Sequence, residues 1–133
     1  RLRMVSLYGI GQKLNYLVLG TSNYNEIYTG YFTKNGDGAC DILPLANLTK
    51  YDIRKLSKEM NIPKKIIEKT PSAGFYPSQS DEKELGLTYD QMEDFFRGEK
   101  VSKIIKQKIQ ILHDKTKHKR NFPKTIINKE KIL

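Results

Sequence analysis

The chain has 133 residues, with 24 Lys and Arg against 15 Asp and Glu and a formal net charge of +9 at pH 7. This length favours one domain or part of one, and because no run of about 18 apolar residues occurs, no membrane span is expected and a cytoplasmic protein is predicted. The single cysteine, Cys40, excludes an internal disulfide and is expected to be a partly buried thiol, while the positive charge fits a protein that handles phosphates.

The first thirty residues predict a helix, a strand and a second helix, in that order. Residues 1–15 space their apolar side chains as an amphipathic helix does. The run "NYLVLGT" at 15–21 is apolar on both faces and predicts a central strand of a parallel sheet. Ser22 is a suitable N-cap for a short helix that ends at Gly30. A strand that turns directly into a helix places N–H groups and hydroxyls where open α/β folds bind ligands.

The segment "TGYFTKNGDGACDILPL", residues 29–45, combines three glycines, two aspartates and one lysine with aromatic residues and a proline. Connections between helices usually span about 2 to 8 residues, so a loop of this length is expected to hold a ligand. By itself "NGDG" predicts a turn, and Gly36 and Gly38 would also let the backbone come close to a ligand. The two interpretations are compatible, because a turn can form the wall of a site.

The middle of the chain predicts two further helices and a second long loop. Asn47 or Thr49 is suited to cap a helix whose apolar residues recur at helical spacing. Pro63 is placed to begin another turn of helix. Residues 70–87, "TPSAGFYPSQSDEKELGL", are rich in Pro, Gly and Ser and predict a turn-rich loop. The two long loops are therefore the candidate ligand-binding segments.

Two helices are predicted after residue 87. The first, over 88–98, is short and acidic and ends at a glycine. Its inward side chains are expected to be Met92, Phe95 and Phe96. The second begins near residue 101 and has a basic last turn that complements its dipole. Its apolar stripe is expected to comprise Ile104, Ile105, Ile109 and Leu112.

An ordered series of motifs carries a family resemblance. The series is "RLRM", "LGTSNYNE", "GYFTKNGDGACDILPL", "TKYDIRKL", "KTPSAGFYPSQSDEKELGLTYDQMEDFF" and "HKRNFP". It resembles the carboxyl-terminal half of the ammonia-dependent NAD synthetases over residues 1–123. The resemblance implies one portion of a single α/β domain, a Rossmann-like parallel sheet flanked by helices and truncated at its amino end, with 124–133 as a basic tail. It also implies a homodimer.

The activity that the resemblance implies is the formation of a carbon–nitrogen bond in NAD biosynthesis. ATP adenylates the nicotinate carboxylate of deamido-NAD and releases pyrophosphate, and ammonia then displaces AMP. Mg²⁺ is the implied metal ion. Whether the ammonia is free or comes from a partner glutaminase stays open, although no glutaminase-like segment occurs in these residues.

The resemblance also assigns roles to individual residues. The implied ATP contacts are Thr21, Lys50 and Ser72; the implied deamido-NAD contacts are Arg1, Lys34, Asp41, His118 and Lys119; and the implied Mg²⁺ ligand is Glu26. No catalytic residue is assigned beyond an electrostatic role for Lys50. Chemistry agrees, since Mg²⁺ in such sites takes one or two carboxylates with waters and phosphates, and a lysine near a helix amino end favours anions. From spacing alone, Glu26 and Lys50 would be taken for surface side chains.

One element of the family pattern does not occur in these residues. A phosphate-binding loop of the type Ser-Gly-Gly-x-Asp-Ser is absent from the sequence, so we expect this chain alone not to adenylate a substrate. Three alternatives remain: a basic nucleic-acid-binding module, another ATP pyrophosphatase, and a dimerisation module without catalysis. Specific nucleic-acid binding is not expected, because Phe122 is the only Phe, Tyr or Trp after Lys100 that could stack on bases.

Overall fold

The structure is a computed structural model that describes residues 1–123, so the predicted basic tail at 124–133 lies outside the described residues. The helices are α1 (Leu2–Leu14), α2 (Tyr24–Thr29), α3 (Lys50–Glu59), α4 (Lys64–Ile67), α5 (Asp81–Leu85), α6 (Tyr89–Phe96), α7 (Lys103–Lys115) and α8 (Lys117–Arg120). Of the helices described, none has the length and apolar character needed to cross a membrane.

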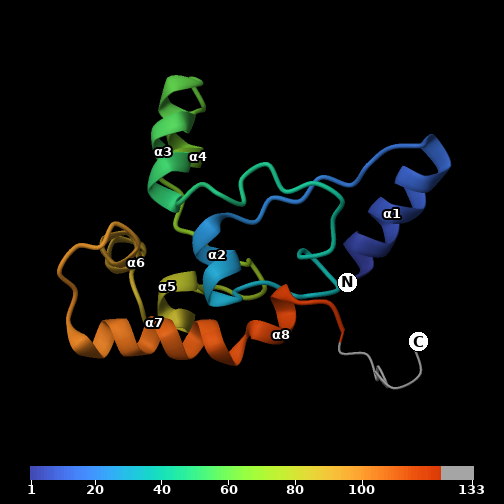
Figure 1. Ribbon diagram of the computed structural model, residues 1–133. Helices are drawn as coiled ribbons and strands as arrows, with labels where there is room; N and C mark the ends of the chain where they lie inside the picture. Colours follow the sequence, from blue (N-terminus) through green and yellow to red (C-terminus); the bar gives the residue numbers. More distant parts are fainter. Residues whose placement is uncertain (124–133) are drawn as a thin grey trace, which may run out of the picture.

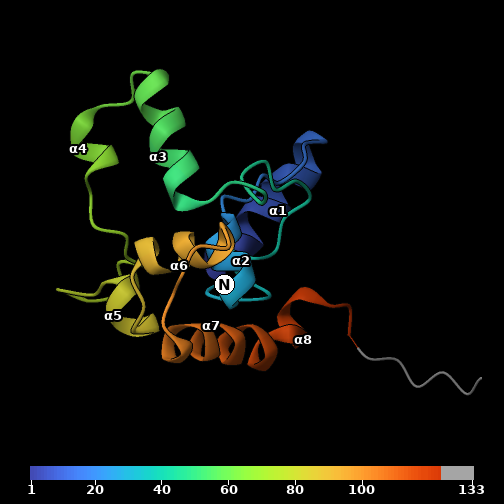
Figure 2. The ribbon, with the colours of Figure 1, turned by 60° about the vertical axis from the view of Figure 1, so that its left-hand side comes forward.

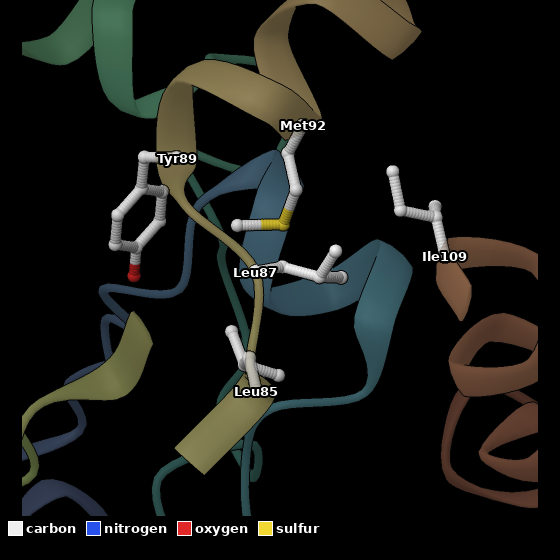
Figure 3. Close-up of a cluster of buried hydrophobic side chains, with 5 residues drawn as sticks. All are labelled: Leu85, Leu87, Tyr89, Met92 and Ile109. Carbon is white, nitrogen blue, oxygen red and sulfur yellow. The ribbon is translucent and has the colours of Figure 1, made fainter. Parts of the chain in front are cut away.

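A small core forms where α5, α6 and α7 meet (Figure 3). It consists of Leu85, Leu87, Tyr89, Met92 and Ile109. Met92 and Ile109 have no exposed surface, and Phe95 and Phe96 pack against the cluster as predicted. Burying apolar side chains of this size is the main favourable contribution to folding, at about 1.5–3 kcal/mol each. The core therefore fixes the carboxyl-terminal helices as one unit.

Helix α2 lies at the centre of the molecule, above α7, and connects this core to the remaining elements (Figure 1). Aromatic rings join it to α6, since Tyr28 lies edge-on to Phe96 at 5.0 Å between ring centroids. Helix α1 lies at one side, and α3 and α4 project together from another (Figures 1 and 2). The loops that run between these parts surround a cavity.

Side-chain caps explain where most of the helices begin. Thr49 and Thr88 cap α3 and α6 with reciprocal capping boxes. Residue 88 is the predicted start of α6, and Thr49 is one of the two caps predicted for α3, the other being Asn47. For α2 the predicted N-cap, Ser22, is wrong by one residue, because Asn23 accepts from the Glu26 N–H and Glu26 accepts from the Asn23 N–H. The position of Glu26 explains why Asn23 is the cap. A capping box needs a Glu or Gln three residues after the cap, and Glu26 is three residues after Asn23.

The predicted central strand at 15–21 is not a strand in the described part of the chain. Val18 and Gly20 are buried while Leu17 and Leu19 are 68% and 61% exposed, so only one face of the segment is covered. The segment makes one isolated parallel bridge, between Leu19 and Ile42. A parallel ladder needs a second extended segment alongside, and residues 1–123 supply only this single pairing. The parallel sheet of the expected fold class is thus represented by one bridge.

Two further predictions need correction, one in α7 and one in the loop at 70–87. Ile104 is 77% exposed and lies outside the buried stripe of α7, whereas Ile109 is fully buried. The long predicted loop at 70–87 also contains α5, which Ser80 caps through the Lys83 N–H. A five-residue helix is too short to produce a periodic apolar pattern, so its sequence gave no helical signal.

Candidate active site

A cavity of about 1040 Å³ lies between the start of α1, the segment after Val18, α2, the glycine-rich loop and the loop before α5. Its lining includes five of the residues assigned from the sequence: Arg1, Thr21, Glu26, Ser72 and Lys119. They come from four separate stretches of the chain, and the fold brings them to one space. Lys34, Asp41, Lys50 and His118 are not among the lining residues.

Glu26 faces this cavity from the first turn of α2. Its carboxylate accepts from the Asn23 N–H at 3.1 Å and from the Asn23 side-chain amide at 2.8 Å. Burial raises the pKa of Glu26, against the Asn23 hydrogen bonds and the nearby charge of Lys50, which lower it. The helix cap therefore orients the carboxylate, and the charge of Lys50 acts on its pKa.

Asp81, the first residue of α5, is a cavity residue that the sequence reasoning missed. It is 5% exposed, and one carboxylate oxygen accepts from the Tyr89 hydroxyl at 3.0 Å. Its other oxygen, Oδ1, is buried without a hydrogen-bond partner in the structure. The negative charge of Asp81 also contributes to raising the pKa of Glu26. Its signal in the sequence was an Asp directly after the Ser80 cap, which is ordinary for a helix start.

These two carboxylates permit a test of whether the residues present fit Mg²⁺. No group of three or more His, Cys, Asp or Glu side chains suited to a metal is found among residues 1–123. Mg²⁺ bound with nucleotides, however, needs only one or two carboxylates, because waters and phosphates complete its octahedron. A partly buried Glu26 beside an Asp81 with a free oxygen supplies that number. The donor set therefore fits Mg²⁺ as a nucleotide-bound ion.

Three polar side chains converge on Glu84 at the edge of the same cavity. The Tyr31 and Tyr76 hydroxyls donate to its carboxylate at 2.5 and 2.8 Å, and the Gln79 amide donates at 2.7 Å. These hydrogen bonds hold the pKa of Glu84 below its ordinary value, with the Tyr31 bond the largest cause. Burial, followed by the bond to Glu84, raises the pKa of Tyr31. The cluster joins α5 and the loop before it to Tyr31, two residues after the end of α2.

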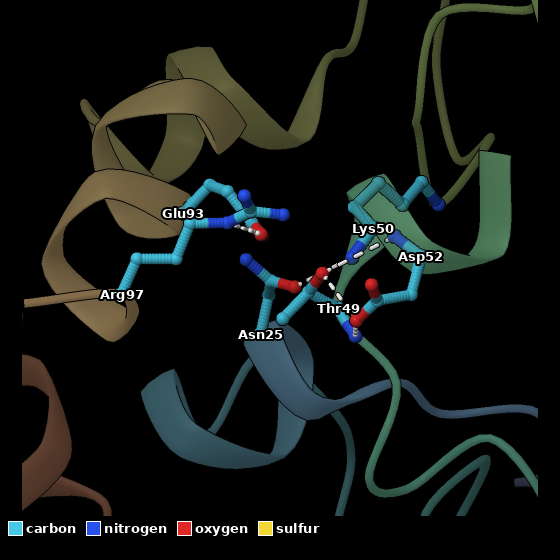
Figure 4. A network of polar contacts seen from close by, with 6 residues as sticks. All are labelled: Asn25, Thr49, Lys50, Asp52, Glu93 and Arg97. Atoms are coloured by element: carbon cyan, nitrogen blue, oxygen red, sulfur yellow. Dashed lines mark hydrogen bonds and ion pairs between the residues drawn. The ribbon is translucent and has the colours of Figure 1, made fainter. Parts of the chain in front are cut away.

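Lys50 is the first residue of α3, and its backbone is held more firmly than its side chain. The Lys50 N–H donates to the Asn25 side-chain oxygen at 2.8 Å (Figure 4). Its ammonium lies 5.5 Å from the centroid of the Tyr89 ring, within cation–π range. Lys50 thus lies beside the cavity, close to Glu26, although it is not a lining residue.

Lys34 and Lys119 are two of the expected deamido-NAD contacts. Each of them binds backbone carbonyls in the segment that carries the other. The Lys34 ammonium donates to the carbonyls of His118 and Asn121, at 2.6 and 2.8 Å. The Lys119 ammonium donates to the carbonyls of Gly30 and Phe32, at 2.7 and 2.8 Å. Both lysines therefore join the glycine-rich loop to α8 in this structure.

The glycine-rich loop itself is closed by a turn and by Asp41. The Gly36 and Gly38 N–H groups both donate to the Thr33 carbonyl, so "NGDG" forms the predicted turn. A side chain at Gly38 would collide with the Phe32 ring. Asp41 accepts from the Val18 N–H at 2.7 Å, and its own N–H donates to the Val18 carbonyl at 2.8 Å. Asp41 therefore fixes the loop against the segment before α2.

Arg1 and Ser72 lie at the outer rim of the cavity and are both exposed. The Ser72 hydroxyl accepts from the Gly74 N–H at 3.1 Å, within the loop before α5. Cys40 is half-buried beside Asp41, and burial raises the pKa of its thiol, which agrees with an unreactive cysteine.

Comparison with known proteins places this arrangement in one family. The sequence model of the NAD synthase family matches residues 1–123. The chain is 50% identical over 133 residues to the NH(3)-dependent NAD(+) synthetase of Malacoplasma penetrans, covering all of this chain and 55% of that protein. It is 48% identical over 126 residues to the enzyme of the same name from Mycoplasma pneumoniae, covering 94% and 51%.

Solved structures agree with the sequence comparison. The NMN synthetase from Francisella tularensis matches with a TM-score of 0.89 and 47% identity, over 93% of this chain and 52% of that one. The NAD+ synthetase from Burkholderia pseudomallei matches with a TM-score of 0.67 and 34% identity, over 91% and 45%. The chain spans about half the length of the relatives it matches. With a family match over residues 1–123, the chain belongs to the NAD synthase family.

Proposed function

We propose that this chain forms part of the active site of an ammonia-dependent NAD synthetase, a ligase. The observation that carries the proposal is the gathering of Arg1, Thr21, Glu26, Ser72 and Lys119 around one cavity. The family resemblance assigns each of these residues to ATP, deamido-NAD or Mg²⁺. A cavity of about 1040 Å³ is also large enough for parts of two nucleotides. The cytoplasmic location remains a prediction from the sequence.

In the first step, an oxygen of the nicotinate carboxylate attacks the α-phosphorus of ATP, and the bond to pyrophosphate breaks. Thr21 and Ser72 would contact ATP, and Lys50 would approach its phosphates with a fixed positive charge. Preplaced cations stabilise the negative charge that develops on the leaving pyrophosphate. Glu26, with Asp81 beside it, would hold Mg²⁺, which when bound neutralises phosphate charge.

In the second step, the ammonia nitrogen attacks the acyl carbon of the mixed anhydride, and AMP leaves with the electron pair of the broken bond. A proton is lost from the attacking nitrogen. Arg1, Lys34, Asp41, His118 and Lys119 would bind deamido-NAD. Lys34 and Lys119 each donate to two backbone carbonyls, which leaves one of the three N–H groups of each ammonium for a ligand oxygen.

The test is product formation by the complete encoded polypeptide, given deamido-NAD, ATP, Mg²⁺ and ammonium. We expect one AMP and one pyrophosphate for each NAD formed. The chain of 133 residues, assayed by itself, is expected to release no pyrophosphate, because it contains no Ser-Gly-Gly-x-Asp-Ser loop. Absence of NAD from the complete polypeptide, with correct folding shown by circular dichroism, would contradict the proposal.

A second candidate is the synthesis of NMN, favoured by the TM-score of 0.89 with the NMN synthetase from Francisella tularensis. The same assay separates the two candidates when deamidated NMN replaces deamido-NAD. A ratio of kcat/KM above one for the mononucleotide would assign NMN synthesis. A ratio below one would assign NAD synthesis.

Homodimer formation is the partner relation that we propose. Along α1 the exposed apolar side chains include Val5, Ile10 and Leu14, each at least half exposed. Ile10 and Leu14 lie one helical turn apart on one face of α1, and exposed apolar side chains on one face commonly mark a protein interface. Burial of this surface against a second copy would also place the start of α1, and with it Arg1, next to the partner.

A further inference from the structure

We propose that Asn25 is a positioning residue, which holds Lys50 at a fixed separation from Glu26 in the active site. The proposal rests on the function proposed above, because it assigns Asn25 through the roles of its two neighbours. Asn25 touches no proposed ligand and does not line the cavity. Its action is on the geometry of residues that do the chemistry.

The first observation is that Asn25 connects two helices from a buried position. It is 1% exposed and lies on α2, one residue before Glu26. Its side-chain oxygen accepts the Lys50 N–H at 2.8 Å, at the first residue of α3 (Figure 4). The Tyr24 N–H donates to the Leu48 carbonyl at 2.9 Å, which gives the same junction a second bond. The start of α3 is therefore set by α2.

The second observation concerns the N–H group that donates a hydrogen bond to Asn25. A helix leaves its first N–H groups without partners inside the helix, and its own cap normally satisfies only one or two. In α3, Thr49 accepts from the Asp52 N–H, and Asp52 accepts from the Thr49 N–H. The Lys50 N–H lies between these two and finds its acceptor on a different helix. Asn25 thus completes the cap of α3 from outside.

The third observation is the environment of the rest of the Asn25 amide. Figure 4 shows its nitrogen directed toward the Glu93 carboxylate on α6. Asn25 Nδ2 and Glu93 Oε2 are both buried, and neither has a hydrogen-bond partner in the structure. The other Glu93 oxygen accepts from Arg97 at 2.6 Å. An acceptor on that side and a donor on the Lys50 side together determine the orientation of the amide.

These contacts place the two charged groups of the proposed site near each other. Lys50 begins α3 against Asn25, and Glu26 is the next residue of α2 after Asn25. The Lys50 ammonium also lies over the Tyr89 ring, whose hydroxyl donates to Asp81. A change at Asn25 would therefore shift Lys50 relative to both carboxylates, while the residues that meet deamido-NAD stay in place.

The experiment compares Asn25→Ala with Thr29→Val in the complete encoded polypeptide. Thr29 is an equally buried residue of α2, and its hydroxyl donates only to carbonyls of its own helix. We expect Asn25→Ala to raise the KM for ATP about tenfold, as loss of one buried acceptor does. The KM for deamido-NAD should change less than twofold, and Thr29→Val should leave both constants within twofold of the wild type.

Several outcomes would overturn the proposal. An unchanged KM for ATP in Asn25→Ala would do so, as would an equal rise in both KM values or an equal effect of Thr29→Val. If Asn25→Ala does not fold, Asn25→Ser is assayed by the same criteria, because its hydroxyl keeps the site polar. A wild-type protein without activity would instead contradict the proposed function, so the two failures are distinguishable.

Discussion

At the scale of single residues, Glu26 serves the fold and the proposed metal site with one carboxylate. It closes the capping box of α2 and faces the cavity. Glu26→Gln should separate these roles, since glutamine also completes a capping box but is a poor ligand for Mg²⁺. We expect kcat/KM to fall about 10² to 10³-fold, with a loss of only about 1 kcal/mol in the free energy of unfolding, because one of the two Asn23 donors loses its acceptor.

The control for this prediction is Glu82→Gln, on the neighbouring helix α5. Glu82 accepts from the Tyr89 N–H and does not line the cavity, so its change should leave kcat/KM within a few fold. Steady-state rates measured against Mg²⁺ concentration, for both variants and the wild type, show whether Glu26 binds the metal ion. Equal activity of Glu26→Gln and the wild type would remove Glu26 from the metal site.

The residue scale also shows what the sequence could predict about the site. Motif positions predicted that Thr21, Glu26 and Ser72 meet, and the cavity brings them together. The contacts of Lys34 and Asp41 could not be predicted, because they depend on distant backbone groups. Lys34 reaches carbonyls 84 and 87 residues away, and Asp41 reaches Val18 across 23 residues. Such partners follow from the fold and leave no local pattern.

At the scale of elements, two helices with equivalent caps differ in one charge. The N3 residue is Asp52 in α3 and Gln91 in α6. The Thr49 backbone N–H and then its hydroxyl donate to Asp52, and these bonds hold the pKa of Asp52 below its ordinary value. A carboxylate with a depressed folded pKa stabilises the fold above its unfolded pKa, and this contribution disappears as the pH falls through the folded pKa.

Thr49→Ala should therefore have a cost that depends on pH. We expect it to lower the free energy of unfolding by about 1 kcal/mol near pH 7, as loss of an N-cap does. This cost should shrink below about pH 4, where Asp52 begins to gain a proton. The matched variant Thr88→Ala loses a cap whose partner, Gln91, is neutral, so its cost should stay constant. Urea unfolding at pH 7 and pH 3 measures both, and equal behaviour would contradict the prediction.

The carboxyl end of α2 binds two cations of α8, Lys119 and Arg120. The Arg120 guanidinium donates to the carbonyls of Ile27, Tyr28 and His113 and to the Thr116 hydroxyl. Arg120→Ala leaves these buried acceptors with fewer donors, so we expect a loss of about 1–3 kcal/mol in the free energy of unfolding.

Arg120→Lys should recover part of this loss, because an ammonium keeps the charge but lacks the fork of donors. Lys117→Ala, at an exposed position of the same helix, is the control and should change stability by less than about 0.5 kcal/mol. Thermal unfolding followed by circular dichroism ranks the three variants. A loss in Lys117→Ala equal to that in Arg120→Ala would assign the effect to α8 as a whole.

At the scale of the whole molecule, helices were more predictable from the sequence than the sheet. Caps and apolar spacing are local signals: they placed the start of α6 and left two candidate caps for α3, Asn47 and Thr49, of which Thr49 is the cap. A strand depends on its neighbours, and the segment 15–21 has one bridge to Ile42 in the described chain. The apolar run is nevertheless informative, because Leu17 and Leu19 remain exposed on a surface that a sheet would cover.

The last prediction concerns α1, whose exposed apolar side chains we propose to be a dimer interface. Ile10 and Leu14 are 58% and 50% exposed and lie one helical turn apart. Changing both to Glu would place two like charges in each half of a symmetric interface, where the partner presents the same patch. We expect the doubly changed protein to sediment as a monomer at concentrations where the wild type is a dimer.

The control, with Glu at the exposed positions Ser6 and Gln12, adds equal charge without removing apolar surface and should remain dimeric. A wild type that sediments as a monomer at micromolar concentration would contradict the proposed homodimer, whereas dissociation of both variants would show that charge on α1, and not its apolar surface, governs assembly.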